Sequence, residues 1–234
     1  MALLSAEGVT RRFGGIVAVD GVSFDVAEGE IVGLIGPNGA GKTTMFNLIT
    51  RLYRPDAGEI VFDGETLLRT PPHGIVKLGI ARTFQNVELF GSMTVLEHVL
   101  LGRHARRGRS PREVLDCLGL AEVAYRPAAE LPYGTQKRVE LARALASGPR
   151  LLLLDEPAGG LNHEEVLELG ALIRRLRANL ELTILLVEHH MGLVMSIAER
   201  VHVLDFGRLI ASGSPAEVQA DQAVVEAYLG AVDV

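Results

Sequence analysis

A glycine-rich loop in the first quarter of the chain constrains the fold more than any other feature. Residues 36–43 match the pattern G-x-x-x-x-G-K-[ST]. The apolar run at 30–35 predicts a strand before the loop, and apolar residues at helical spacing over 45–52 predict a helix after it. A strand, this loop and a helix in that order are the context in which the pattern indicates a phosphate-binding site.

The chemistry expected of this loop follows from its backbone. Its glycines let successive N–H groups point at phosphate oxygens, and the helix from about Gly41 adds its positive N-terminal end. Lys42 would hold the β and γ phosphates of ATP, and Thr43 would ligate Mg²⁺. The residues expected to contact ATP here are Gly36, Pro37, Asn38, Gly39, Ala40, Gly41, Lys42, Thr43 and Thr44. The alternative is a glycine-rich turn that holds a lysine by chance.

A second chemical signal follows the apolar run at 151–154. Asp155 and Glu156 come directly after this predicted buried strand, where open α/β sheets place their ligands. Asp155 would hold Mg²⁺ through water, and Glu156 would polarise the attacking water. Alone, such a pair is usually a solvated strand end. Together with the glycine loop it indicates an enzyme that hydrolyses ATP.

The remaining pattern predicts an α/β fold with two additions. Strands at 3–9, 22–26 and 59–68, the last interrupted by the turn pair Asp63-Gly64, indicate an antiparallel sheet. Helices expected within 95–146, with a basic break at 103–109, indicate an inserted helical lobe. The later predictions are a helix at about 164–178, a strand at 184–187, a hairpin at 201–211 and a helix after Ser214 with Glu217 in a capping box.

Composition narrows the class of protein. The 234 residues are 48% hydrophobic and 22% charged, as in folded globular chains. The formal net charge of −6 argues against nucleic acid as a partner. Cys117 is the single cysteine, so neither an intramolecular disulfide nor a cysteine zinc cluster is expected. The first 13 residues do not read as a signal peptide and no apolar run reaches about 18 residues, so we expect any membrane contact to go through another protein.

The segment at 131–143 adds a family resemblance. Its sequence begins Leu-Pro-Tyr-Gly-Thr-Gln and continues with Arg138, Ala142 and Arg143. It resembles the signature of the ABC ATPases, as 154–157 resembles their Walker B region, and the resemblance runs from about residue 3 to 229. The fold implied is a P-loop NTPase core with an antiparallel β subdomain and an inserted helical subdomain. In one such domain over 1–234, residues 1–30 and 58–70 would form the β subdomain, 86–146 the helical subdomain, and 31–57 with 147–234 the nucleotide-binding core.

The resemblance also implies further site residues. Phe13 is similar to the aromatic that stacks on adenine, Gln85 to the glutamine that senses Mg²⁺ and the membrane subunit, and His189 to the switch histidine. By themselves, these could be a core aromatic, a surface residue and a structural histidine. Two subunits of this family pair head to tail, so the signature of one covers the ATP on the loop of the other. The implied signature contacts are Tyr133, Gly134, Thr135 and Gln136.

The chain departs from the family pattern in three places. Pro132 replaces the signature serine, so the backbone at Gly134 and the helix N-terminus must do more of the binding. Asn162 stands where many members carry an aspartate that contacts the other subunit. The helical lobe is short between residues 102 and 130. Tyr133-Gly134, residues 79–85 and residues 158–162 are similar to the branched-chain amino acid importer group.

The resemblance therefore implies the ATP-hydrolysing subunit of an importer for branched-chain or related amino acids, energised by ATP-driven closure of a dimer. Implied partners are polytopic membrane permease subunits, a second ATPase subunit that is identical or related, and indirectly a periplasmic or extracellular substrate-binding protein. The implied location is peripheral, on the cytoplasmic face of the plasma (inner) membrane. The alternatives are a soluble ABC ATPase acting on ribosomes or DNA, the ATPase of another ABC transporter class such as an exporter, and a module that binds ATP without hydrolysing it.

Overall fold

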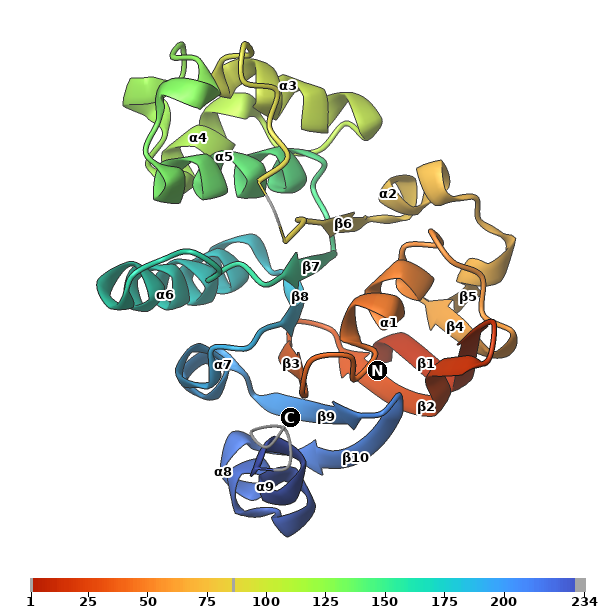
Figure 1. The fold of residues 1–234 in the computed structure, drawn as a ribbon. Helices are drawn as coiled ribbons and strands as arrows, with labels where there is room; N and C mark the ends of the chain where they lie inside the picture. The colour runs from red at the N-terminus through yellow and green to blue at the C-terminus, as the bar shows by residue number, and fades with distance from the viewer. Residues whose placement is uncertain (1, 86, 230–234) are drawn as a thin grey trace. The chain divides into compact units, whose positions relative to one another are not determined.

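The computed structural model describes residues 2–85 and 87–229 and is drawn in Figure 1. The chain divides into two compact units. The first unit contains residues 1–75 and 183–234, and the second unit contains residues 76–182.

The first unit opens with an antiparallel sheet, as predicted. Its strands are β1 (Ala2–Phe13), β2 (Ile16–Ala27), β4 (Ala57–Phe62) and β5 (Glu65–Thr66), in the order β2-β1-β4-β5. The turn between β4 and β5 has positive φ at Asp63 (51°) and Gly64 (78°), as a two-residue hairpin requires. Strand β5 ends earlier than the predicted residue 68, because Thr66 accepts a hydrogen bond from the Leu68 N–H and starts the 3₁₀ turn η1 (Leu67–Arg69).

A second set of strands in the same unit carries the buried core. These strands are β3 (Ile31–Ile35), β8 (Thr183–Val187), β9 (Arg200–Asp205) and β10 (Arg208–Gly213). Strand β3 lies between β8 and β9 and runs parallel to both, while β10 pairs antiparallel with β9. Every residue of β3 and β8 is buried, which explains why both read as unbroken apolar runs.

The first unit also contains several helical segments, one of which begins at a predicted capping box. Besides η1, the helical segments of this unit are α1 (Lys42–Ile49), η2 (Pro72–Gly74), α7 (Met191–Ile197), α8 (Pro215–Ala220) and α9 (Gln222–Leu229), while α2 (Ile75–Leu78) crosses into the second unit. The predicted capping box at α8 is confirmed. Ser214 Oγ accepts from the Glu217 N–H at 3.4 Å, and Glu217 Oε2 accepts from the Ser214 N–H at 2.7 Å.

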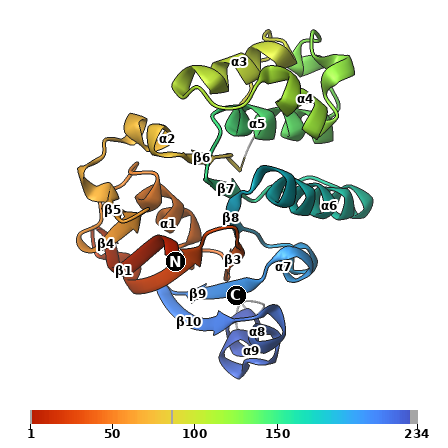
Figure 2. The ribbon, with the colours of Figure 1, turned by 180° about the vertical axis from the view of Figure 1, so that it is seen from behind.

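The second unit contains one parallel pair of strands and the predicted helices. Strand β6 (Ile80–Arg82) pairs with β7 (Leu151–Asp155), and the sequence analysis missed β6 because three residues are too few to show a period. The helical segments are α3 (Val95–Ala105), α4 (Pro111–Leu118), η3 (Ala121–Val123), η4 (Ala128–Glu130), α5 (Tyr133–Ala146) and α6 (His163–Leu180). Helices α3, α4 and α5 form one group, seen from both sides in Figures 1 and 2.

The basic break between α3 and α4 has a structural role. Arg106 donates to the carbonyl oxygens of Ser147, at 3.1 Å, and Gly148, just past the last turn of α5. Arg109 Nη2 donates to the carbonyl oxygen of Leu180, the last residue of α6, at 2.8 Å. Carbonyl groups at a helix C-terminus carry partial negative charge, so these guanidinium groups stabilise the ends of both helices.

Candidate functional site

In the first unit, the glycine loop turns sharply between β3 and α1. Gly36 has φ of 149° and Gly41 has φ of 104°, values that L side chains rarely adopt. A Cβ atom at Gly36 would collide with the carbonyl oxygen of Leu204, and one at Gly41 with that of Ala18. Both glycines are therefore required by close backbone approach as well as by conformation. Gly41 is also the N-cap of α1 and has no side chain that could accept a hydrogen bond. The first N–H groups of α1 are therefore not capped by a side chain and can bind an anion.

The lysine of this loop is held by the loop backbone. Lys42 is only 5% exposed, and its Nζ donates to the carbonyl oxygens of Gly36 at 2.7 Å and Pro37 at 2.8 Å. Thr43, the next residue, is exposed, and Thr44 is half-buried in the first turn of the helix. The segment thus concentrates an ammonium group, a helix N-terminus and hydroxyl groups within a few residues.

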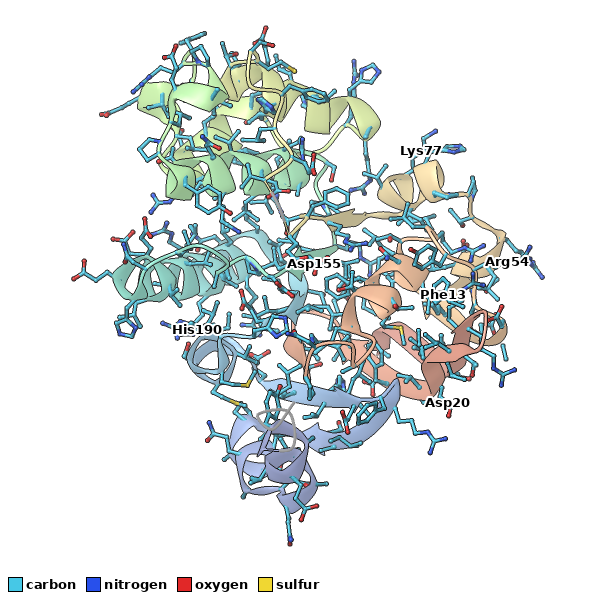
Figure 3. All side chains as sticks on the ribbon, viewed as in Figure 1. Phe13, Asp20, Arg54, Lys77, Asp155 and His190 are labelled. Atoms are coloured by element: carbon cyan, nitrogen blue, oxygen red, sulfur yellow. The ribbon has the colours of Figure 1, made fainter. Side chains whose placement is uncertain are left out.

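Phe13 lies at the end of β1, opposite Ile16 of β2. Its ring is 38% exposed. The guanidinium of Arg11 lies 4.6 Å from the ring centroid, and Tyr53 meets the ring edge-on with a centroid distance of 5.1 Å. The sequence analysis did not foresee Arg11 and Tyr53 as neighbours. Figure 3 labels Phe13. The ring is accessible enough for the predicted stacking on adenine, which stays a prediction.

His189 and His190 follow strand β8, and a buried carboxylate fixes their backbone. Glu188 is 2% exposed, and its Oε2 accepts from the N–H groups of His189 at 3.0 Å and His190 at 3.1 Å. The Nδ1 atom of His190, which is labelled in Figure 3, accepts from the Leu193 N–H and caps α7. His190 is exposed, as expected. His189 is exposed as well.

In the second unit, Asp155 is the last residue of β7 and is 3% exposed. Its Oδ2 forms an ion pair with Arg82 Nη2 at 2.6 Å, and its N–H donates to the Thr83 hydroxyl at 3.4 Å. Figure 3 labels Asp155 at the end of the strand. Glu156 follows with φ of 47°, a left-handed conformation uncommon for glutamate. Such local strain is often found at functional sites.

The structure brings two of the predicted site residues into contact. Gln85 Nε2 donates to Glu156 Oε2 at 2.7 Å. The two side chains come from segments that follow neighbouring parallel strands, β6 and β7. The pair that the sequence analysis assigned to sensing and to water activation is thus directly joined within this unit.

The signature segment begins helix α5. Pro132 is its N-cap and makes no side-chain cap bond, and its carbonyl oxygen accepts from the N–H groups of Thr135 at 2.9 Å and Gln136 at 3.0 Å. Gln136 Nε2 donates to the carbonyl oxygen of Leu131 at 2.9 Å. Gly134 and Thr135 are half-buried in the first turn.

Tyr133 and Asn162 contact residues within this unit. The Tyr133 ring lies so close to Gly160 that a Cβ atom there would be 2.9 Å from its Cε1. Asn162 is the N-cap of α6, where its Oδ1 accepts from the Glu165 N–H at 3.0 Å and Glu165 Oε2 accepts from the Asn162 N–H at 2.8 Å. Asn162 was predicted only as a neutral residue facing a second subunit, and its role as a helix cap was missed.

Two ionisable residues near the site were missed by the sequence analysis. Arg82 pairs with Asp155, and Glu140, 3% exposed on α5, accepts from the Phe84 N–H at 2.9 Å. Arg82 follows Ile80 and Ala81, and Glu140 stands between Val139 and Leu141. A charged residue next to buried apolar neighbours is a signal for a buried pair. Glu140 also lines a cavity of about 200 Å³ within the second unit, together with Phe84, Lys137, Leu172 and Ile173.

Among residues 2–85 and 87–229, no helix is long and apolar enough to cross a membrane. Within the same ranges no three histidine, cysteine, aspartate or glutamate side chains form a group that could hold a metal ion.

Comparisons with known proteins agree with one another. The family model "ABC transporter" matches residues 19–159, and the model "Branched-chain amino acid ATP-binding cassette transporter" matches 208–234. Two relatives named as high-affinity branched-chain amino acid transport ATP-binding proteins, BraF from Pseudomonas aeruginosa and LivG from Escherichia coli strain K12, are each 43% identical over 97% of this chain and 98% of their own. The crystal structure of the ADP conformation of MJ1267, an ATP-binding cassette of an ABC transporter, has a TM-score of 0.90 at 32% identity and covers 98% of this chain and 99% of its own.

The fold expected from the sequence is thus confirmed, and the match extends over nearly the whole chain rather than the glycine loop alone. Because both the family model and these relatives align over most of its length, the chain belongs to the ABC transporter family as an ATP-binding subunit, the component that hydrolyses ATP to drive transport.

Proposed function

We propose that this chain energises an importer for branched-chain or related amino acids by binding and hydrolysing MgATP. The observation that carries the ATPase chemistry is the loop in which Lys42 is buried against the carbonyl oxygens of Gly36 and Pro37. The class of transported substrate rests on the relatives and on the family model at 208–234. Neither a ribosome nor DNA is suggested by any of these relatives.

The residues present fit MgATP. Thr43 offers a hydroxyl, Asp155 a carboxylate and Gln85 an amide oxygen, all hard donors of the kind that Mg²⁺ binds together with phosphate oxygens. Held by these residues, Mg²⁺ would supply positive charge that neutralises the phosphates. The N–H groups of residues 36–44 and the Lys42 ammonium would hold the phosphates, and Phe13 would stack on the adenine.

Hydrolysis is assigned to Glu156, with help from two other residues. Glu156 would orient water for in-line attack on the γ-phosphate, while Lys42 and His189 stabilise the charge that develops on the phosphoryl oxygens. The hydrogen bond between Gln85 and Glu156 supports this assignment, because it gives the water-activating carboxylate a defined partner. Gln85 would also help to hold Mg²⁺ through its amide oxygen.

The signature would act on a second subunit. Two nucleotide-binding subunits, identical or related, would close head to tail around two ATP molecules, with Tyr133, Gly134, Thr135 and Gln136 facing the γ-phosphate held by the other. Pro132 offers no hydroxyl there, so the N-terminus of α5 supplies the positive end of a helix dipole instead.

The remaining assignments concern place and partners. Polytopic permease subunits would hold the chain at the cytoplasmic face of the plasma (inner) membrane, and a periplasmic or extracellular binding protein would deliver the substrate to them. Residues 1–30 and 58–70 would act as the β subdomain, 86–146 as the helical subdomain that faces the permease, and 31–57 with 147–234 as the nucleotide-binding core.

Two variants test the chemistry. Glu156→Gln should keep ATP binding and lose turnover, because the amide cannot take a proton from water. Lys42→Ala should lose both. The matched controls are Glu164→Gln in the exposed first turn of α6 and Lys77→Ala on the exposed face of α2, which should leave both measurements unchanged. Ordinary turnover in Glu156→Gln would overturn the role given to that residue.

A separate experiment tests the transport assignment. The protein is purified by affinity from gently solubilised native membranes, and the proteins that remain bound are identified by mass spectrometry. Recovery of polytopic membrane subunits supports the importer proposal. Recovery of ribosomes or DNA-repair factors would remove it and leave the ATPase chemistry intact.

A further inference from the structure

A hydrogen bond to helix α5 attaches the beginning of the segment that carries Gln85. The N–H of Phe84 donates to Glu140 Oε1 at 2.9 Å. Glu140 is 3% exposed, although Phe84 itself is 43% exposed. This bond fixes the residue immediately before Gln85 to the third turn of the signature helix.

The same helix holds the segment beyond Gln85. Arg143 Nη1 donates to the carbonyl oxygen of Glu88 at 2.5 Å. Arg143 Nη2 also lies 3.8 Å from Glu140 Oε1. Residues three apart on a helix share a face, so the two attachment points are neighbours joined by an ion pair.

A buried carboxylate at position 140 would destabilise the fold if it only filled space. Its neighbours Val139 and Leu141 are buried apolar side chains. Burial raises the pKa of Glu140, and hydrogen bonding to Phe84 and the charge of Arg143 oppose that rise. Glu140 also lines the cavity within this unit. An apolar residue would avoid the desolvation penalty, so the carboxylate is explained by what it holds.

Gln85 lies between the two residues that helix α5 attaches, Phe84 and Glu88. Between the attachment points, Gln85 Nε2 donates to Glu156 Oε2 at 2.7 Å. We propose that Glu140 and Arg143 are positioning residues through which the signature helix sets where Gln85 meets Glu156. This inference rests on the proposed function for the catalytic meaning of Gln85 and Glu156, while the attachment itself can be tested without it.

Amide hydrogen exchange on the full chain tests the attachment. Glu140→Ala should accelerate exchange at Phe84 and in the peptide that contains Gln85, because the Phe84 N–H loses its acceptor. Glu140→Gln should restore protection, since the amide oxygen accepts the same bond. Arg143→Met, which replaces a less buried side chain, should accelerate exchange in the residues around Glu88. An unchanged exchange rate in Glu140→Ala would overturn the inference. If Glu140→Ala does not fold, an unchanged exchange rate around Glu88 in Arg143→Met would overturn it.

Steady-state kinetics test the consequence for catalysis. Glu140→Ala should lower kcat by on the order of 10- to 100-fold, the loss expected for a catalytic group displaced by about 1 Å. The KM for MgATP should change by no more than about 2-fold, because the phosphate-binding loop is untouched. Glu140→Gln should recover most of kcat. Faster exchange with an unchanged kcat would overturn the positioning role.

Matched controls separate this inference from general loss of structure. Glu168→Ala and Arg112→Met remove exposed partners of the surface ion pairs Arg138–Glu168 and Arg112–Asp116. Neither should alter exchange near Gln85 or kcat. If Glu156→Gln retained turnover, the catalytic role proposed for Glu156 would fail while the exchange result for Glu140 still stood, so the two failures are distinguishable.

Discussion

Arg82 and Asp155 form a buried ion pair between neighbouring parallel strands, with Nη2 and Oδ2 2.6 Å apart. The two side chains are 8% and 4% exposed. Asp155 is the carboxylate proposed to hold Mg²⁺, and a fixed cation from the adjacent strand orients it. Little solvent reaches the pair to screen it.

The first prediction concerns stability. Arg82→Met should lower the free energy of unfolding by about 3–5 kcal/mol, because it leaves a buried carboxylate without its partner. Urea denaturation of the full chain measures this loss. Arg208→Met is the matched control, since Arg208 is 72% exposed in its pair with Asp20 and should change stability by about 0–1 kcal/mol. Adding Asp155→Asn to Arg82→Met should recover part of the loss. A single-variant loss as small as that of the control would contradict the argument.

The second prediction concerns the glycines of the phosphate-binding loop. Gly36→Ala should abolish nucleotide binding and destabilise the fold, because its Cβ would collide with the Leu204 carbonyl oxygen. Gly39→Ala is the control within the same loop: it also has positive φ, 79°, but no other atom lies within 4 Å of its would-be Cβ. It should cost only the backbone strain, about 1–2 kcal/mol. Thermal unfolding and ATP titration distinguish the two. Equal effects in both variants would mean that position 36 requires glycine because of its positive φ and not because a Cβ atom would collide with Leu204.

Local signals in the sequence were sufficient for much of the fold. The turn at Asp63-Gly64, the capping box of Ser214 and Glu217, and the apolar runs of β3, β7 and β8 depend on residues close together in the chain. The interactions behind these signals are short-range, so they can be predicted from a single sequence. The loop at 36–44 belongs to the same class, because its chemistry lies in its own backbone and one lysine.

Contacts between distant segments could not be foreseen in the same way. Arg82 lies 73 positions from Asp155, and Glu140 lies 56 positions from Phe84. Their partners depend on which strand pairs with which and on where α5 lies, and strand β6 is too short to show a period. The helix-capping roles of Arg106 and Asn162 were missed for related reasons, since residues of these types usually lie on solvated surfaces.

The third prediction concerns the base of the nucleotide. If Phe13 stacks on adenine, Phe13→Ala should raise the Kd for ATP by about 2- to 12-fold, the equivalent of an aromatic contact worth about 0.5–1.5 kcal/mol. The Kd for tripolyphosphate, which has no base, should stay the same. Phe13→Tyr should bind ATP normally. Equilibrium titrations with both ligands make the comparison. Equal weakening for the two ligands would show that Phe13 supports the loop through Tyr53 and Arg11 and does not contact adenine.

The fourth prediction concerns pH and the fully buried His98 on α3. Its Nδ1 lies 2.9 Å from the Thr94 carbonyl oxygen and its Nε2 accepts from the Phe90 N–H at 3.0 Å, which requires a neutral ring. Burial lowers the pKa of His98 below its ordinary value. Below about pH 6.5 the unfolded chain therefore binds a proton that the native ring resists, so stability falls as pH falls through that range. Burial lowers the pKa of His202 too, so His98→Gln should reduce, and not remove, the loss. Urea denaturation at about pH 7.5 and about pH 5.5 measures it. An equal loss in the variant and the natural chain would show that His98 is not a source of the pH dependence.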